Sequence, residues 1–198
     1  MEKKFILTDK FVINSFGIKL FQIKCTKSFK YAQKGDFGGY VEKEGNLDQE
    51  NDAWVFGNAR VFGNARVSSN ARVSGDAWVS DNALVSGDAW VSDNAWVSSN
   101  AWVSGDARVS GNAWVSGNAD IENDNEHCGF DGFGSCNRHT HAYMTKEKKV
   151  EIICGCFRGS IEEFEKKVEE THSGTVYEKQ YKSIINVIKI KFGLTDFT

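Results

Sequence analysis

The chain has 198 residues, a formal net charge of −3 and a hydrophobic content of 40%. This length and hydrophobicity are sufficient for one or two domains with a buried core, and the slight acidity gives no overall electrostatic attraction to nucleic acid. No apolar run reaches the ~18 residues of a membrane span, and the N-terminal sequence MEKKFILTDK lacks the apolar core of a signal peptide. We therefore expect a cytoplasmic protein with no membrane partner.

The N-terminal segment, residues 1–44, is predicted to be β structure. Two apolar runs, FVIN and IKLFQIKC, flank the turn-like sequence Asn14-Ser15-Phe16-Gly17. The segment precedes a stack of repeats whose first coil would otherwise present an unpaired edge to other chains. We expect these residues to form a β cap over that edge.

The central segment, residues 45–124, repeats a six-residue unit. In each unit Ala and an aliphatic residue flank one variable residue, as in Ala77-Trp78-Val79, and this alternation predicts a short strand with Ala and Val facing inward. The other three residues, mostly Gly, Asn, Asp and Ser, predict a tight corner. Such short strands bury a face only by coiling and stacking, so three units per turn predict about four coils. GNLDQE is a degenerate first unit, with Leu47 at the small inward position.

The spacing of these residues, an aliphatic residue every six positions with a small residue two positions earlier, resembles the left-handed parallel β-helix of hexapeptide-repeat proteins. The order of segments along the chain, a β entry segment followed by the repeat and a C-terminal portion, resembles that of a family of small hexapeptide-repeat proteins of phages and prophages. This family is related to bacterial proteins labelled as hexapeptide transferases. The resemblance rests on GDFGGYVEKEGNLDQENDAWV before the repeat and GFGSCNRHTHAYMTKEKKVEIICGCF after it. It implies a left-handed coil, and it specifies architecture better than activity.

The C-terminal segment, residues 125–198, is predicted to be a ββαα domain. A polar, glycine-rich linker ends the repeat, and HTHAYMT and VEIICGCF then predict two strands joined by KEKK. Ser160 and Glu163 form a capping box that opens one helix, and a second helix is expected from about Val176 to Ile190. The predicted fold class is thus mainly β: a left-handed parallel β-helix between a β cap and a small ββαα domain.

Histidines and cysteines are the candidate catalytic and metal-binding residues. Acyltransferases with the resembled fold use a histidine at a subunit boundary, but the repeat contains no histidine and no loop insertion. The five cysteines form no CxxC pair, so we expect reduced thiols, no metal and no cofactor. We expect one of Cys154 and Cys156 to be buried and the other to be more exposed. The minority alternative is a zinc site drawn from Cys128, Cys136, Cys156 and His172.

A short polar stretch is a candidate site for an anionic ligand. Asn137, Arg138, His139 and Thr140 lead from a glycine-rich segment onto a predicted strand. The planar guanidinium of Arg138 is suited to a phosphate or carboxylate. The alternative is an ordinary exposed strand entry.

The outward residues of the repeat indicate an interface. Residues eighteen apart stack on one face, and one face reads Arg60, Trp78, Trp96 and Trp114; the other two read Trp54, Arg72, Trp90, Arg108 and Arg66, Leu84, Trp102, Asp120. The combined apolar area of three consecutive indoles approaches the few hundred Å² of the largest apolar patch that a soluble monomer normally exposes. We predict a partner-binding surface there, with Trp102 as an additional contact. The alternative is an intramolecular ladder covered by the C-terminal segment.

These features together predict a binding protein without its own catalysis. Self-association to a dimer or trimer through the Trp face is expected first, and binding of a host protein second. The phage resemblance implies a protein that inhibits a host component, such as a defence system, or sequesters a small ligand. An acyltransferase is the alternative, and a structural part of a virion is third.

Overall fold

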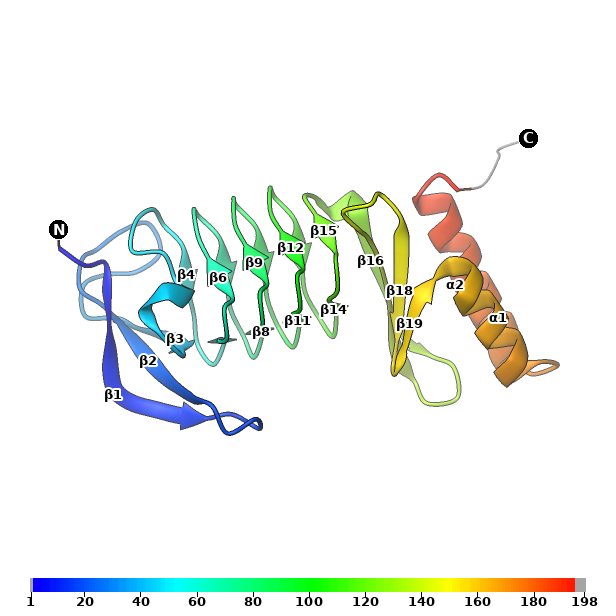
Figure 1. The fold of residues 1–198 in the computed structure, drawn as a ribbon, viewed down its shortest axis with the longest axis horizontal. Helices are drawn as coiled ribbons and strands as arrows, with labels where there is room; N and C mark the ends of the chain where they lie inside the picture. Colours follow the sequence, from blue (N-terminus) through cyan, green and yellow to red (C-terminus); the bar gives the residue numbers. More distant parts are fainter. Residues whose placement is uncertain (1, 195–198) are drawn as a thin grey trace.

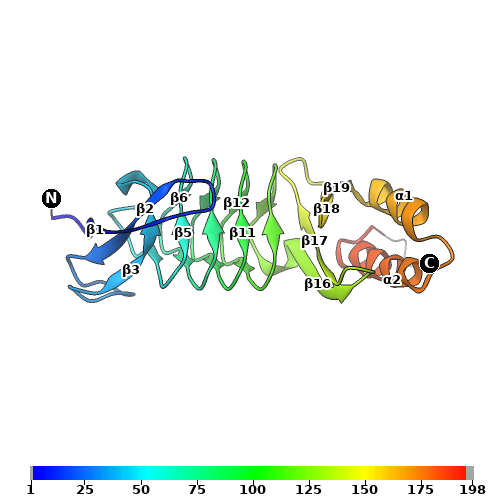
Figure 2. The same cartoon turned by 90° about the horizontal axis from the view of Figure 1, so that it is seen from below.

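The protein is an elongated rod in a computed structural model that describes residues 2–194. Its N-terminal hairpin and its C-terminal helices lie at opposite ends of a stack of short strands (Figure 1). The view turned by 90° shows the same succession from hairpin to solenoid to helices (Figure 2). No helix in this part of the chain is long and apolar enough to cross a bilayer.

The middle of the rod is a parallel β-solenoid. Its strands form three parallel stacks, β5-β8-β11-β14, β4-β7-β10-β13 and β6-β9-β12-β15, and successive strands of a stack pair residues eighteen apart. The periodicity of the sequence predicts this register, which is therefore confirmed. The strands are β4 (Trp54–Val55), β5 (Arg60–Val61), β6 (Arg66–Val67), β7 (Arg72–Val73), β8 (Trp78–Val79), β9 (Leu84–Val85), β10 (Trp90–Val91), β11 (Trp96–Val97), β12 (Trp102–Val103), β13 (Arg108–Val109), β14 (Trp114–Val115) and β15 (Asp120–Ile121).

The core of the solenoid consists of the inward Ala and Val residues. Val73, Val91 and Val109 stack in one sheet, and each is fully buried. The corners explain the remaining residue types, because one residue of each corner has a left-handed backbone, such as Ser69 with φ 58° and Asp81 with φ 58°. Gly, Asp and Ser at these positions tolerate a backbone that β-branched residues resist. The small inward and polar corner residues thus both follow from the coil geometry.

The first coil departs from the predicted register. Strand β3 (Phe37–Val41) pairs in parallel with β5, joining Val41 to Val61, and Leu47 pairs with Val67. Both spacings are twenty residues instead of eighteen, because two extra residues lie between Leu47 and Val55, and Val55 already pairs with Val73 in the regular register. A short 3₁₀ helix, η1 (Glu44–Asn46), precedes Leu47. Leu47 therefore occupies the large aliphatic position, and its prediction as the small inward residue was wrong. With this coil the solenoid has about five turns, more than the four expected.

The N-terminal strands β1 (Phe5–Ile13) and β2 (Lys19–Cys25) form the predicted antiparallel hairpin and extend the β3 sheet. Lys4 Nζ donates to the carbonyl oxygens of Glu50, Asn51 and Ala53 at 2.9–3.1 Å. Burial lowers the pKa of Lys4 to about 8. The hairpin is thereby anchored to backbone of the first coil by a buried ammonium group.

Trp54 is covered by this N-terminal segment. Its ring meets those of Phe5 and Phe29 edge-on at 6.3 and 5.4 Å, and only 1% of the residue is exposed. Arg72 pairs in register with Trp54 and Trp90, as expected, and its guanidinium lies over the ring of Trp90 at 4.6 Å. Trp54 points outward from its strand, but it is not exposed to solvent because the N-terminal segment packs on it.

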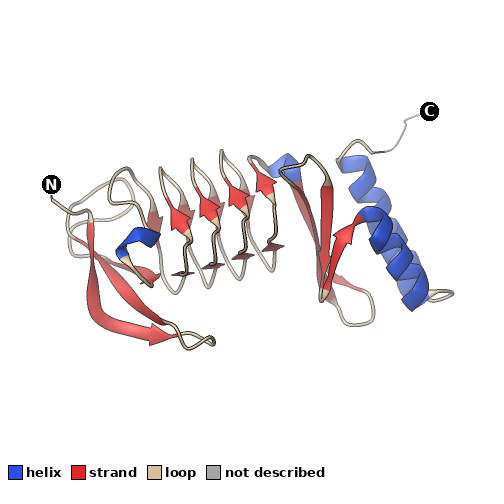
Figure 3. Ribbon diagram, viewed as in Figure 1, coloured by secondary structure: helices blue, strands red, loops and turns tan. Residues whose placement is uncertain are grey.

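The C-terminal segment contains four strands and two helices, so the prediction of two strands was wrong. An antiparallel sheet with the order β16-β17-β18-β19 lies between the solenoid and the helices (Figure 3). The predicted linker is largely strand β16, because it pairs with β17 across most of its length. The capping box of Ser160 and Glu163 is confirmed at the start of the first helix. The elements are β16 (His127–Phe133), β17 (Arg138–Met144), β18 (Val150–Cys154), β19 (Phe157–Ser160), α1 (Ile161–His172) and α2 (Val176–Lys191), with the 3₁₀ helix η2 (Asp124–Glu126) before them.

The last coil of the solenoid is joined to the C-terminal segment by polar contacts at each of its three edges. His141 donates to the carbonyl oxygen of Trp114, Asp124 accepts from the backbone N–H of Arg108 at 2.8 Å, and the backbone N–H of Lys146 donates to the carbonyl of Asn118 at 2.9 Å. An unpaired strand edge would otherwise leave these backbone groups without partners. The solenoid therefore ends against protein rather than as an open edge.

Candidate functional site

The first candidate site is the aromatic face of the solenoid, defined here as Phe16, Trp78, Trp96 and Trp114. The predicted vertical order of the three indoles is confirmed, since Trp78 pairs with Trp96 and Trp96 with Trp114. The rings of Trp96 and Trp114 stack at 5.3 Å with an interplanar angle of 5°, and those of Trp78 and Trp96 meet edge-on at 5.9 Å. Arg60 begins the row, with its guanidinium 5.1 Å from the ring of Trp78.

Phe16, at the tip of the β1–β2 hairpin, covers part of this face. Its ring lies 6.0 Å from that of Trp78 and 6.4 Å from that of Trp96. Trp78 and Trp96 are consequently half-buried, whereas Trp114 is 38% exposed. In the alternative to an interface, the C-terminal segment would cover the indoles in part, but it is the N-terminal hairpin that packs on Trp78 and Trp96. A cavity of about 440 Å³ remains beside Phe16, and its wall adds the polar side chains Asp76 and Asn94.

Trp102 lies on a different sheet, between Leu84 and Asp120 in register. It is 46% exposed, and Lys146 Nζ lies 4.1 Å from its ring. The structure therefore does not bring Trp102 together with the aromatic face. The cation stabilises the exposed indole within the chain.

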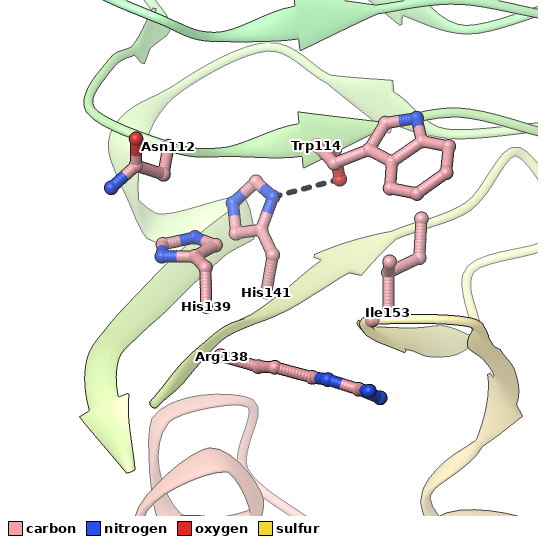
Figure 4. Close-up of a pocket in the computed structure, with 7 residues that line it drawn as sticks. Asn112, Trp114, Arg138, His139, His141 and Ile153 are labelled. Atoms are coloured by element: carbon pink, nitrogen blue, oxygen red, sulfur yellow. Dashed lines mark hydrogen bonds between the residues drawn. The ribbon is translucent and has the colours of Figure 1, made fainter. Parts of the chain in front are cut away.

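The second candidate site is a cavity of about 240 Å³ between the last coil and the C-terminal sheet (Figure 4). Arg138, His139 and His141 on β17 form one side, and Asn112 and Trp114 of the solenoid form the other. Trp114 thus belongs to both the aromatic face and this cavity. The predicted anion-binding group is divided, because Arg138 and His139 line the cavity while Asn137 lies in the preceding turn and Thr140 points away from it. Thr140 is fully buried and its hydroxyl donates to Cys154 Sγ at 3.3 Å.

Three histidines, one from β16 and two from β17, meet beside this cavity. Because a carbonyl only accepts, Nδ1 of His141 must donate to Trp114, at 3.1 Å. Neutral His141 then accepts at Nε2, so His127 donates from Nδ1 at 3.1 Å. Burial lowers the pKa of His141 to about 3 and also lowers the pKa of His127. The alternation in HTH places His139 and His141 on one strand face, but only the β16–β17 pairing adds His127.

His139 forms a pair with Asp131 at 2.8 Å, and this hydrogen bond lowers the pKa of Asp131. The other ring nitrogen, Nε2, is buried and has no hydrogen-bond partner within residues 2–194. It lies against backbone, since a Cβ on Gly129 would be 2.8 Å from it. The nitrogen that a general base would use is therefore shielded from a ligand in the cavity.

The histidine cluster predicts acid sensitivity. The folded-state pKa of His141 lies below its unfolded value, so the unfolded chain binds a proton that the folded chain excludes as the pH falls below about 6.5. We expect the free energy of unfolding to fall below pH 6.5 by up to about 1.4 kcal/mol per pH unit for this group. Urea titrations between pH 7 and 5, where carboxylates stay ionised, measure this slope.

The control for this titration is His141→Gln, which keeps a hydrogen-bond donor but has no proton to gain. We expect a smaller slope in this variant, even though its stability at pH 7 is lower. An identical slope in both proteins would show that His141 is not the buried neutral group described here.

Four of the five cysteines and His172 lie around the C-terminal sheet and helices, whereas Cys25 is buried at the end of β2. Cys154 is buried and Cys156 is exposed, as expected from their alternation, although a turn at Gly155 separates them. Cys128 is half-buried on β16, where burial raises the pKa of its thiol to about 11, and Cys136 lies exposed in the turn before β17. Within the described residues no three His, Cys, Asp or Glu side chains are close enough to hold a metal ion.

Comparison with known protein families finds a match to the solenoid. Four segments, residues 53–69, 65–81, 77–93 and 101–117, match the family model described as YdcK Beta solenoid repeat. The rod carries the repeat of a β-solenoid family. The matched segments include Trp78 and Trp114 of the aromatic face, and Trp96 lies between two of them. No curated protein matches the chain.

Proposed function

We propose that this β-solenoid protein acts by binding a protein partner through its aromatic face, without catalysis of its own. The observation that carries the proposal is the exposed end of the aromatic stack: Trp114 is held rigidly on Trp96 yet remains 38% exposed. A preformed indole loses little conformational freedom on binding, and Trp is the residue type most favoured at the centre of interfaces. Phe16 covers part of Trp78 and Trp96, so a partner would contact mainly Trp114.

A second copy of this chain is the first proposed partner. A stack of identical strands gives a flat surface that is self-complementary under rotation, which suits a dimer or trimer. The resemblance to phage and prophage proteins supports a host protein, such as a defence component, as the second partner, which this protein would inhibit in the host cytoplasm. We also propose the left-handed coil of the resembled proteins, with the N-terminal hairpin and the C-terminal sheet as caps on the two ends.

Replacing Trp78, Trp96 and Trp114 together with Ser should reduce the mass measured by light scattering to that of one chain. The three side chains point away from the core, so the circular dichroism spectrum should keep its shape. A matched control replaces Trp90 and Trp102, which are exposed on the other two sheets, and should retain the oligomer. If the triple variant keeps both its oligomeric mass and its partner binding, the aromatic face is only an intramolecular ladder.

An acyltransferase is the second candidate function, favoured by the pair of His139 and Asp131 at the wall of the cavity beside Trp114. A carboxylate that orients a histidine is a recurrent arrangement for a general base. The buried Nε2 of His139 and the paired ring of His141 weigh against it. Protection of the protein by acetyl-coenzyme A in thermal melting would favour the enzyme over the binding protein. A structural role in a virion remains the third proposal.

A further inference from the structure

A separate cavity lies on the opposite side of the C-terminal sheet from the histidine cluster. It has a volume of about 230 Å³ and lies between the sheet and the two helices. Its floor is apolar and aromatic: Phe164 and Tyr181 are buried, and Phe157 lies beside them. Ring centroids are 5.0 Å apart for Phe157 and Phe164 and 5.5 Å apart for Phe164 and Tyr181. This floor offers a preformed surface for a flat apolar group.

The rim of the cavity carries two cationic side chains and an imidazole. Arg138 comes from the start of β17, and Lys167 and His172 come from α1. No Asp or Glu is among the described residues that line the cavity. Arg138 and Lys167 beside an apolar floor produce a positive potential that an anion would neutralise.

The position of Arg138 depends on a glycine. Gly155 has φ 59°, and a Cβ at this residue would lie 2.5 Å from Nη1 of Arg138. A side chain at this turn would therefore displace the guanidinium. Arg138 forms no ion pair with any residue between 2 and 194, and Lys167 has only an exposed contact with Glu170 at 3.7 Å. Both cations are thus available to a ligand.

We infer that this cavity binds a small organic anion that carries a single aromatic ring, as in an aryl phosphate or an aryl carboxylate. The ring would lie on the floor of Phe157, Phe164 and Tyr181, and the acidic group would face the cationic rim. A guanidinium recognises phosphate and carboxylate by two parallel hydrogen bonds, and Lys167 adds a point charge. The volume is below the 300–1,000 Å³ typical of drug-sized ligands, which limits the ligand to about one ring.

This inference is independent of the proposed protein interface, because the cavity contains no residue of the aromatic face. Arg138 also lines the cavity beside Trp114, so variants at Lys167 are needed to assign binding to the helix side. If the cavity binds no aromatic anion, the proposed protein interface is unaffected, and the reverse also holds.

Titration calorimetry of the full chain with phenyl phosphate tests the inference. Benzoate is the carboxylate probe, inorganic phosphate supplies charge without a ring, and benzyl alcohol supplies a ring without charge. We expect phenyl phosphate or benzoate to bind saturably at one site, and more tightly than either control compound. Failure of both aromatic anions to bind saturably, or phosphate binding as tightly as phenyl phosphate, would overturn the inference.

Variants assign the binding to this cavity. Arg138→Gln should weaken the affinity about tenfold, as expected for loss of a charge-assisted hydrogen bond, and Lys167→Gln should weaken it by a smaller factor. The matched control is Lys166→Gln, the neighbouring exposed lysine on α1, which should bind as the wild type does. Circular dichroism of each variant verifies folding. Unchanged affinity in Arg138→Gln and Lys167→Gln would show that the anion binds elsewhere and would refute the assignment.

Discussion

Val91→Asp is expected to unfold the middle of the solenoid or to prevent expression of folded protein. Val91 is fully buried between Val73 and Val109, and its neighbours inside the coil are Ala and Val. A carboxylate there loses its hydration and gains no partner, which costs at least several kcal/mol. This cost is a large part of the free energy of unfolding of a typical domain, which is roughly 5–15 kcal/mol. Thermal melting followed by circular dichroism measures the effect.

The adjacent residue gives the matched control for this substitution. Trp90 points outward, is 37% exposed, and makes one hydrogen bond to Ser74 at 2.9 Å besides its contact with Arg72. Trp90→Ser should cost about 1 kcal/mol, the sum expected for one exposed hydrogen bond and one cation–π contact. Equal damage from both substitutions would contradict the assignment of inward and outward positions along the strands.

Trp54→Ala is expected to have the second largest effect. The indole is buried between Phe5 and Phe29, so its removal leaves a cavity beneath the N-terminal segment and costs about 3–5 kcal/mol. For a chain of this size that loss lowers the melting temperature by about 10 °C. Hydrogen exchange should show increased opening of β1 and β2, because their contacts with the first coil depend on this residue.

The control is Trp102→Ala, which removes the same side chain from an exposed position on another sheet. We expect a fall in melting temperature several times smaller than that of Trp54→Ala. A similar fall in both would mean that Trp54 is not the anchor of the N-terminal segment.

The solenoid itself follows from local sequence rules. Each inward Val and each left-handed corner is specified within one six-residue unit, so a prediction needs only the period and the residue types. Asp81 at a corner and Val79 inside illustrate the two kinds of position. The helix starting at Ile161 is equally local, because the capping box of Ser160 and Glu163 acts within one turn.

The missed features depend on contacts between distant segments. Gly129 and Gly132 make residues 127–133 read as a linker, yet pairing with β17 makes them a strand. Phe16 reads as a turn residue, and nothing local indicates that its ring packs on Trp78. The histidine cluster likewise requires the β16–β17 register, which brings His127 to His141. Tertiary context overrides local propensity in each case.

The most direct test of the proposed interface compares two single substitutions by sedimentation velocity over a range of protein concentrations. Trp114 and Trp90 are almost equally exposed, at 38% and 37%, but only Trp114 belongs to the aromatic face. We expect the wild type and Trp90→Ser to sediment as the same oligomer, and Trp114→Ser to shift toward one chain at the lower concentrations. Wild-type protein that sediments as one chain at every concentration, or a Trp114→Ser variant that associates as the wild type does, would contradict self-association through this face.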